Sequence, residues 1–392
     1  MSVKGKFEVN RYYRNMNICF ITYRYPGKHN TSDFAFVKQL VDAIASLGHH
    51  CLVLAPFNIS HYKRLSVPVE EYEVKKGVVT VFRPGYLSFS NFHIGKFRPS
   101  SLSHKNALKR AFRMLSVKPD AIYGHFWSSA YDGYEYAKRN NIPLFVATGE
   151  SEISKLFSPK VDQKEFSEYV SGVICVSSKN KDESVSLGLT INEKCKVFPN
   201  SVNAGLFREM DKWQCREQLG LPQDVFIIAF VGWFIERKGT LRVSEAIKQI
   251  EGKKVYSLFI GKGDQVPDCD NILFKGALPH EEVPLYLNAA DVFVLPTLHE
   301  GCCNAVVEAM ACGLPVISSD LPFNWDVLNK GNSIMVNPNS INEIRDAIVE
   351  MRDNNVKRMQ LSQGALVSVQ DLTIENRAQA IVEFINSRIN NK

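Results

Sequence analysis

Hydrophobic positions along the chain fall into two series of short apolar runs separated by amphipathic segments. The first series opens with a strand pattern at 17–22, a Pro/Gly/Asn-rich loop at 25–33 and a helix pattern at 37–47, which Gly48 ends. Its later members are strand patterns at 51–54, 121–123, 143–147 and 172–176 and helix patterns at 131–139 and 179–187. Strands that alternate with helices favour a parallel sheet covered on both faces.

The second series begins at 225–232, the most apolar run in the chain. Strand patterns follow at 255–260, 272–275, 292–295, 315–318 and 334–336, and helix patterns at 240–250, 281–289, 304–312 and 341–352. The last helix pattern, at 375–390, has apolar residues to bury and is expected to cross back to the first domain. The whole pattern predicts an α/β protein of two doubly wound, Rossmann-like domains that face a central cleft.

The length of 392 residues suits two domains of this kind. We predict a flexible extension at 1–15, an N-terminal domain at 16–203, a C-terminal domain at 204–373 and the crossing helix at 374–392. No apolar run approaches the roughly 20 residues that span a bilayer, and no signal-peptide pattern is present, so we expect a cytoplasmic protein. The nine cysteines lie mostly in apolar runs without zinc-ligand spacing, which predicts reduced thiols in the core.

Positive charge is concentrated in the first half of the chain. Residues 1–200 contain 28 Lys and Arg against 17 Asp and Glu, whereas the remaining residues contain 19 against 24. The excess is densest at 96–118, where an apolar helical stripe has a basic opposite face and aromatic residues stand just upstream. The basic face includes Lys105, Lys109, Arg110 and Arg113. It can contact an anionic membrane, or it is the solvated face of an ordinary helix; no nucleic-acid-binding motif accompanies it.

Two carboxylates in the second domain carry the most informative pattern. Neither domain has a dinucleotide-binding glycine fingerprint after its first strand, and no P-loop occurs. In the segment 296–320, however, Glu300 lies in the loop after a buried strand and Glu308 in the following helix, so both should face the cleft. Backbone N–H groups at the start of that helix can hold a phosphate without a metal; they belong to Cys303, Asn304 and Ala305.

Glu300 and Glu308, followed by Ala-Met-Ala-Cys-Gly-Leu-Pro-Val, resemble the E-x7-E signature of the retaining, GT-B-fold "group 1" glycosyltransferases, which include mannosyl-, glucosyl- and N-acetylglucosaminyltransferases. The resemblance covers nearly the whole chain, including Asn200-Ser-Val-Asn203 on the hinge side. It implies that the second domain binds a nucleotide-sugar, with Glu308 on the ribose hydroxyls and Glu300 at the transferred sugar. The resemblance implies that the protein requires neither a metal nor a cofactor. The nucleotide-sugar counts as a substrate.

A second family element, G-R-x4-K-G, neutralises the donor diphosphate in proteins of this family. Here it reads Gly232-Trp-Phe-Ile-Glu-Arg-Lys-Gly, so Gly232 and Lys238 match while Trp233 takes the arginine position. Loss of that arginine removes one bidentate phosphate clamp. Arg237 either substitutes for it from four residues further on or is a solvated loop charge.

In the first domain, the stretch 120–126 resembles the family's D-x-x-H-x-H-F. The resemblance places His125 beside the donor sugar, whereas Tyr123 replaces the first histidine. Glu150 and Ser151 follow the next strand, and we expect them to contact the acceptor.

Three loop positions complete the expected cleft. Phe34, preceded by Asp33, stands near the position of a family glycine. Backbone atoms of the loop from Gly276 to Leu278 should contact the nucleobase, as in similar proteins. His299 is expected to be a locally hydrogen-bonded loop residue.

Together these features predict a metal-independent glycosyltransferase that moves a sugar from a UDP- or GDP-sugar to a saccharide or polyprenyl-diphosphate-linked acceptor in bacterial surface polysaccharide or glycolipid synthesis. Retention of configuration follows from the resemblance alone. The basic segment favours a location at the inner face of the plasma membrane. Two alternatives stay open: a catalytically silent sugar-nucleotide-binding subunit and a nucleotide-sugar epimerase of the same fold.

Overall fold

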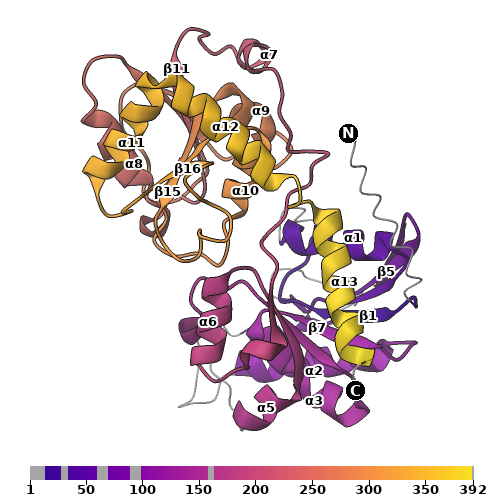
Figure 1. Ribbon diagram of the computed structural model, residues 1–392. Coiled ribbons are helices and arrows are strands. Elements are labelled where there is room, and N and C mark those ends of the chain that lie inside the picture. The colour runs from indigo at the N-terminus through magenta and orange to yellow at the C-terminus, as the bar shows by residue number, and fades with distance from the viewer. Residues whose placement is uncertain (1–13, 28–33, 60–68, 89–98, 158–162, 391–392) are drawn as a thin grey trace, which may run out of the picture.

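The computed structural model describes residues 14–27, 34–59, 69–88, 99–157 and 163–390, which form two α/β domains that face each other (Figure 1). Within these residues the N-terminal sheet has the order β10-β9-β8-β7-β1-β2-β5-β4, and only the β4–β5 pair is antiparallel. Its strands are β1 (Asn17–Ile21), β2 (His50–Leu54), β4 (Val69–Val74), β5 (Gly77–Phe82), β7 (Ala121–His125), β8 (Leu144–Thr148), β9 (Val170–Cys175) and β10 (Cys195–Val197). The short strands β3 (Phe57–Asn58) and β6 (Gly85–Tyr86) pair separately.

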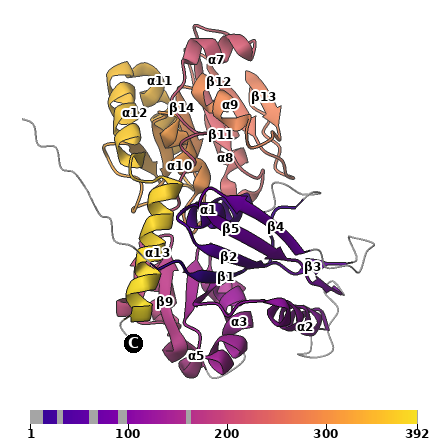
Figure 2. The same cartoon turned by 90° about the vertical axis from the view of Figure 1, so that its right-hand side faces the viewer.

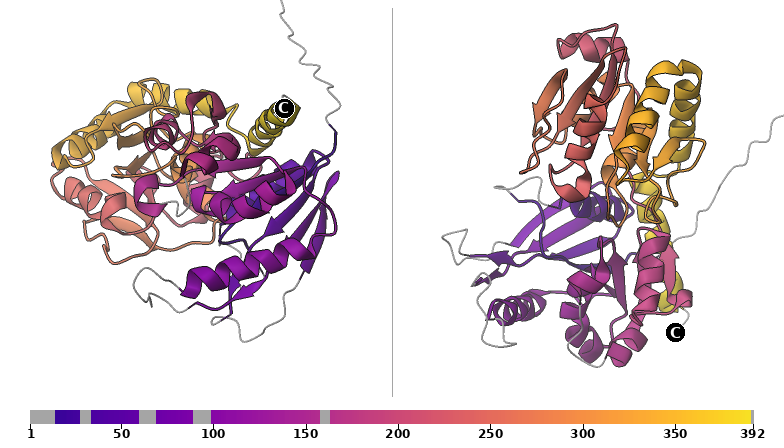
Figure 3. Two further views of the ribbon diagram at one scale, coloured as in Figure 1. Left: turned by 90° about the horizontal axis from the view of Figure 1, so that it is seen from below. Right: turned by 90° about the vertical axis from the view of Figure 1, so that its left-hand side faces the viewer.

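Helices cover both faces of this sheet because alternate strand residues are apolar on both sides. One face is covered by α1 (Ala35–Ser46) and by the last helix, α13 (Ile374–Asn390). The other is covered by α2 (Pro99–Met114), α3 (Trp127–Asn140) and α5 (Gln163–Tyr169). Figure 3 shows α2 and α13 on opposite sides of the domain. The remaining helices are α4 (Ile153–Leu156) and α6 (Ser178–Ser186).

The C-terminal domain has a parallel sheet of order β13-β12-β11-β14-β15-β16 around one hydrophobic core. Its strands are β11 (Phe226–Val231), β12 (Val255–Ile260), β13 (Ile272–Gly276), β14 (Val292–Leu295), β15 (Val316–Ser319) and β16 (Ser333–Val336). Its helices are α7 (Lys212–Gln218), α8 (Thr240–Lys248), α9 (Val283–Ala289), α10 (Asn304–Ala311), α11 (Ile341–Asp353) and α12 (Asn355–Val369).

The two chain crossings between the domains lie side by side. The backbone N–H of Val202 donates to the carbonyl of Leu372 (2.9 Å), and the N–H of Ile374 donates to the carbonyl of Val202 (3.1 Å). After this point α13 runs back over the N-terminal domain and packs against α1 and β9 (Figures 1 and 2). The crossing point is therefore a short, hydrogen-bonded hinge.

The predicted α/β fold of two Rossmann-like domains is confirmed. The sequence analysis missed the antiparallel strand β4, in which glutamates occupy half of the positions, and its largely buried partner β5. It also missed α12, which buries only Leu361, Ala365 and Val369. Most of the predicted extension, 1–13, lies outside the described residues. Among the described helices, none combines the length and the apolar character that crossing a membrane requires.

Candidate active site

Three charged side chains meet after the carboxyl ends of β11 and β14. Oε1 of Glu300 lies 2.5 Å from Nζ of Lys238 and accepts a hydrogen bond from Nη1 of Arg237, also at 2.5 Å. Oγ1 of Thr297 donates to the same oxygen at 3.2 Å. Burial opposes the charge of Lys238, but Cys303 and Glu300 outweigh burial and raise the pKa of the ammonium. The cluster of Arg237, Lys238 and Glu300 therefore carries one net positive charge and suits an anionic ligand.

Glycines shape the loop that carries Lys238. A Cβ on Gly261 would lie 1.8 Å from the carbonyl oxygen of Gly232, so the loops after β11 and β12 touch backbone to backbone. The lysine stem runs across Gly232, with Cδ 3.6 Å from where a Cβ would stand. Gly239 has a φ of 81°, a left-handed conformation that glycine adopts without strain. These features aim a buried Lys238 at Glu300.

Helix α10 points its N-terminus at this cluster. Nζ of Lys238 lies 3.9 Å from Sγ of Cys303, the N-cap residue, whose side chain makes no capping hydrogen bond. The positive end of a helix dipole and its unpaired N–H groups favour an anion at this position. The side chain of Asn304 instead accepts a hydrogen bond from Nδ2 of Asn200 at 2.6 Å, so any donor contact of Asn304 falls to its backbone.

The second carboxylate of the motif has a partner that the sequence analysis did not single out. Oε1 of Glu308 lies 2.9 Å from Nε2 of His280, and this hydrogen bond raises the pKa of the histidine. His280 follows Leu278 by two residues, so its place after the predicted base-contacting loop was the available signal. The carbonyl of Gly276 accepts from the N–H of Gly261 (2.8 Å), which fixes this loop beside the one after β12.

The arginine position of the family motif lies at the rim of the site. Trp233 is 56% exposed, and the ammonium of Lys262 stands 5.5 Å from its ring centre. Arg237 donates both to Glu300 and to the carbonyl of His299 (2.6 Å). The structure thus places the charge of Arg237 next to Glu300 and Lys238, and its substitution for the family arginine stays a prediction.

In the N-terminal domain, His125 sits among aromatic rings at the end of β7. Its ring centre lies 4.5 Å from that of Phe126 and 5.4 Å from that of Phe36. Burial, with a contribution from the nearby charge of Arg377, lowers the pKa of His125 to about 3, so the imidazole is neutral near pH 7. Phe34 has a φ of 54°, which agrees with its place at a family glycine position. Asp33 lies outside the described residues.

The structure assigns Glu150 a role different from the predicted acceptor contact. Its carboxylate is buried and accepts hydrogen bonds from the backbone N–H of Trp127 (2.8 Å), Oγ1 of Thr148 (2.7 Å) and the N–H of Gly149 (2.9 Å). These bonds hold the start of α3 against the end of β8. Glu150 is therefore a positioning residue, whereas Ser151, which is partly exposed, remains a predicted acceptor contact.

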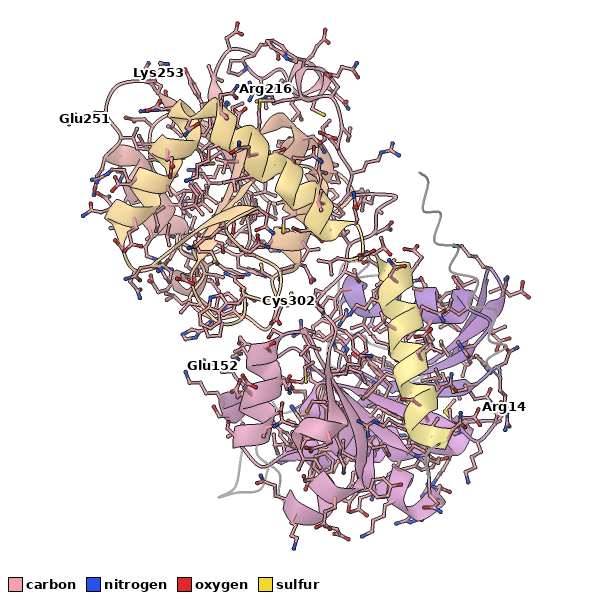
Figure 4. All side chains as sticks on the ribbon, in the orientation of Figure 1. Arg14, Glu152, Arg216, Glu251, Lys253 and Cys302 are labelled. Carbon is pink, nitrogen blue, oxygen red and sulfur yellow. The ribbon has the colours of Figure 1, made fainter. Side chains whose placement is uncertain are left out.

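The loops that carry the predicted residues of the two domains touch. Nδ2 of Asn200 donates to the carbonyl of Cys302 (2.8 Å), and Asp326 accepts from the N–H (2.7 Å) and Oγ (2.6 Å) of Ser178. Figure 4 shows Cys302 between the two domains. Next to it, a Cβ on Gly301 would stand 2.3 Å from the carbonyl oxygen of Gly149. The structure is thus closed around the Glu300 loop.

Replacing Gly301 with Ala is expected to keep the domains from closing fully. The added methyl group clashes with backbone of the other domain, which cannot yield as a side chain would. A shift of about 1 Å at a reacting centre can cost about 100-fold in rate, so we expect a loss of that order. Donor turnover measures this loss, and an unchanged melting temperature would show that each domain still folds. Full activity of the variant would contradict this role of Gly301.

On the far side of the N-terminal domain, α2 presents a basic surface. Lys105, Lys109, Arg110 and Arg113 are all exposed, while Ala107, Leu108, Ala111 and Phe112 are buried against the sheet. The guanidinium of Arg110 donates to the carbonyl of Gly85 (2.5 Å). Exposed Leu102, Met114 and Val117 border the charges. The apolar stripe thus packs on the core, and the segment 89–98, with the upstream aromatics Phe89, Phe92 and Phe97, lies outside the described residues.

Two facing Rossmann-like domains with such a cluster define a GT-B glycosyltransferase architecture. Sucrose-phosphate synthase from Thermosynechococcus elongatus superimposes with a TM-score of 0.77 at 21% identity, covering 96% of this chain and 100% of that one. HepE from Anabaena, solved with UDP and glucose, gives 0.69 at 17% identity over 95% and 100%.

Sequence comparison identifies the family. Residues 211–366 match the family model "Glycosyl transferases group 1", and residues 35–206 match "Glycosyltransferase Family 4". The chain is 25% identical to the putative teichuronic acid biosynthesis glycosyltransferase TuaC of Bacillus subtilis over 91% of this chain and 94% of TuaC. It is 27% identical to an Escherichia coli UDP-Gal:α-D-GlcNAc-diphosphoundecaprenol α-1,3-galactosyltransferase over 75% and 82%. The chain belongs to the group 1 glycosyltransferases and is a transferase.

Proposed function

We propose that this glycosyltransferase transfers a hexosyl group, with retention of configuration, from a UDP- or GDP-sugar to a saccharide or polyprenyl-diphosphate-linked acceptor in surface polysaccharide or glycolipid synthesis. The observation that carries the proposal is the contact of buried Lys238 and partly exposed Arg237 with Glu300, next to the N-terminus of α10. Two cations and a helix N-terminus hold the leaving diphosphate. No metal ligand set is required for this charge balance.

The remaining residues divide the work of binding and transfer. Glu308, supported by His280, accepts hydrogen bonds from the ribose hydroxyls, and the backbone from Gly276 to Leu278 contacts the base. When the donor binds, its diphosphate replaces Glu300 as the partner of Lys238 and Arg237. The freed carboxylate of Glu300 then faces the positive charge that develops on the sugar in the transition state. Neutral His125 can donate one hydrogen bond to the same sugar from the opposite domain.

The acceptor side of the proposal rests on charge and on named relatives. The E. coli relative acts on a diphosphoundecaprenol-linked sugar by its name, and α2 of this chain offers exposed lysines, arginines and apolar side chains on one surface. Such a surface attracts anionic headgroups while the catalytic cleft stays accessible. A peripheral position on the inner membrane face follows from this proposal.

A thermal-shift panel tests the donor assignment. UDP or GDP should raise the melting temperature, because a ligand that binds only the folded state stabilises it. Incubation with the matching nucleotide-sugars, without acceptor, should then release free sugar slowly. Binding without any release of sugar would indicate the silent subunit, and conversion into another nucleotide-sugar would indicate an epimerase. The absence of a shift with every nucleoside diphosphate would refute the proposal.

Charge reversal on α2 tests the membrane surface. Vesicles with anionic lipids should bind the wild-type protein, and Lys109→Glu with Arg113→Glu should reduce binding about 10-fold or more, because each basic residue contributes about 1 kcal/mol near such a surface. Arg110 is left unchanged because it also holds the backbone of β6. Lys253→Glu with Lys254→Glu is the matched control, since these exposed lysines lie on the other domain. Equal binding of both double variants would contradict the proposed surface.

A further inference from the structure

One arginine at the hinge is largely covered by the protein and has no acidic partner among the described residues. Arg377 stands in the first turn of α13, four residues after Thr373, where the chain has crossed between the domains. Its guanidinium makes no hydrogen bond or ion pair with any of the described residues, and its Nε atom is shielded from solvent. A charge that is largely withdrawn from water is costly unless it is paired or binds a ligand.

Other polar groups around Arg377 are also unsatisfied. Tyr123 is 1% exposed, and its buried hydroxyl has no hydrogen-bond partner among the described residues. Both ring nitrogens of His125 are also buried, and neither has a hydrogen-bond partner among the described residues. The two residues are separated by one position on β7 and so lie on one face of the strand. Tyr123 belongs to the hydrophobic core that α1 and α13 share.

The charge of Arg377 acts on this group and on the opposite domain. It contributes to the low pKa of His125 and partly offsets the rise that burial causes in the pKa of Tyr123. It also acts on the Cys302 thiol, which lies between Gly301 and the N-cap of α10. The charge of Arg377 thus acts on the segment that follows Glu300, from a helix that packs on the N-terminal domain.

We propose that Arg377, Tyr123 and His125 form a subsite at the hinge end of the cleft for one oxyanion of a substrate, a carboxylate or a phosphate. A guanidinium binds either group through two hydrogen bonds, while the tyrosine hydroxyl and the neutral imidazole each add one donor. The inference rests on the proposed function, but the oxyanion is a second one, distinct from the donor diphosphate at Lys238. It is either the carboxylate of a hexuronic acid on the donor or a phosphate on the acceptor.

Stability without ligand gives the first test. Arg377→Met keeps the apolar stem and removes the uncompensated charge, so its melting temperature is expected to equal or exceed that of the wild type. Arg388→Met on the same helix is the matched control, because the guanidinium of Arg388 donates to the carbonyl of Glu193 and lies 5.3 Å from the ring centre of Phe384. A melting temperature of the Arg377→Met variant clearly below wild type would show that the charge is satisfied inside the protein and would overturn the subsite.

Binding gives the second test. With saturating UDP or GDP on the diphosphate site, inorganic phosphate should raise the melting temperature of the wild type and of Arg388→Met, but not of Arg377→Met. The source of the oxyanion is found by comparing UDP-glucuronate with UDP-glucose, or the GDP-mannuronate and GDP-mannose pair. A donor carboxylate predicts roughly 10-fold or tighter binding of the uronate, lost in Arg377→Met.

An acceptor phosphate instead predicts no preference between the two donors. It also predicts a phosphate-induced rise in melting temperature that persists with UDP-glucose or GDP-mannose bound, whose hexose is uncharged. Either pattern supports the subsite. The absence of both a phosphate shift and a uronate preference in the wild type would overturn the subsite. Failure of UDP and GDP themselves to bind the wild type would refute the proposed function, so the two failures are distinguishable.

Discussion

Replacing Glu300 with Gln is expected to reduce sugar transfer by about 100- to 1000-fold while nucleoside diphosphate binding stays equal or becomes tighter. Removing one preorganised electrostatic contact to a transition state has an effect of this size. At the same time, the neutral amide no longer competes for Lys238 and Arg237, each of which lies 2.5 Å from Oε1 of Glu300. Free-sugar release from the donor measures turnover, and calorimetry with UDP or GDP measures binding.

Glu308→Gln is the informative comparison for this experiment. Glu308 lies one turn into α10 and pairs with His280 rather than with the cations, so its loss should weaken nucleotide binding first. The two variants thus separate catalysis from binding. If Glu300→Gln retained wild-type turnover, the carboxylate would have no part in the transition state, and the proposed mechanism would be wrong.

Replacing Lys238 with Met is expected to weaken donor binding by roughly 10- to 100-fold, since a hydrogen bond to a charged group contributes about 1.5–3 kcal/mol. The methionine keeps most of the buried stem that crosses Gly232, so the loop should hold its shape. Arg237 remains paired with Glu300, which limits the cost to folding. Titration with UDP and with uridine alone checks that the loss concerns the diphosphate.

Lys262→Met is the matched control for this second prediction. Lys262 is exposed and stands over Trp233 at the rim, so its removal changes the net charge equally without touching Glu300. We expect donor affinity to change less than twofold in this variant. Equal losses in the Lys238→Met and Lys262→Met proteins would indicate general electrostatic attraction instead of a diphosphate contact at Lys238.

The apolar pattern predicted the fold well because a doubly wound sheet buries each strand on both faces. Strands β12 (Val255–Ile260) and β14 (Val292–Leu295) occur at the predicted residues. Most other boundaries moved by a few residues, as expected when caps and tertiary contacts set the ends. Strand β4 escaped prediction because a partly exposed edge strand carries charged residues and shows no continuous apolar run.

For the candidate site, the sequence placed Glu300, Glu308 and Lys238 through motif spacing. It could not decide between the two interpretations of Arg237, because the direction of a long side chain depends on what packs around the loop. It also missed His280 as the partner of Glu308. The inward turn of Glu150 arises from backbone N–H groups that only the folded β8–α3 junction brings together.

The sequence by itself therefore determined the α/β fold of two Rossmann-like domains and the family, because periodicity and short motifs encode them locally. Only the tertiary structure decided which charges meet. Arg377 and Tyr123 lie 254 positions apart in the numbering, and no local pattern relates them. Tyr123 and the first turns of α13 share one hydrophobic core because α13 returns across the hinge and covers the same face of the N-terminal sheet.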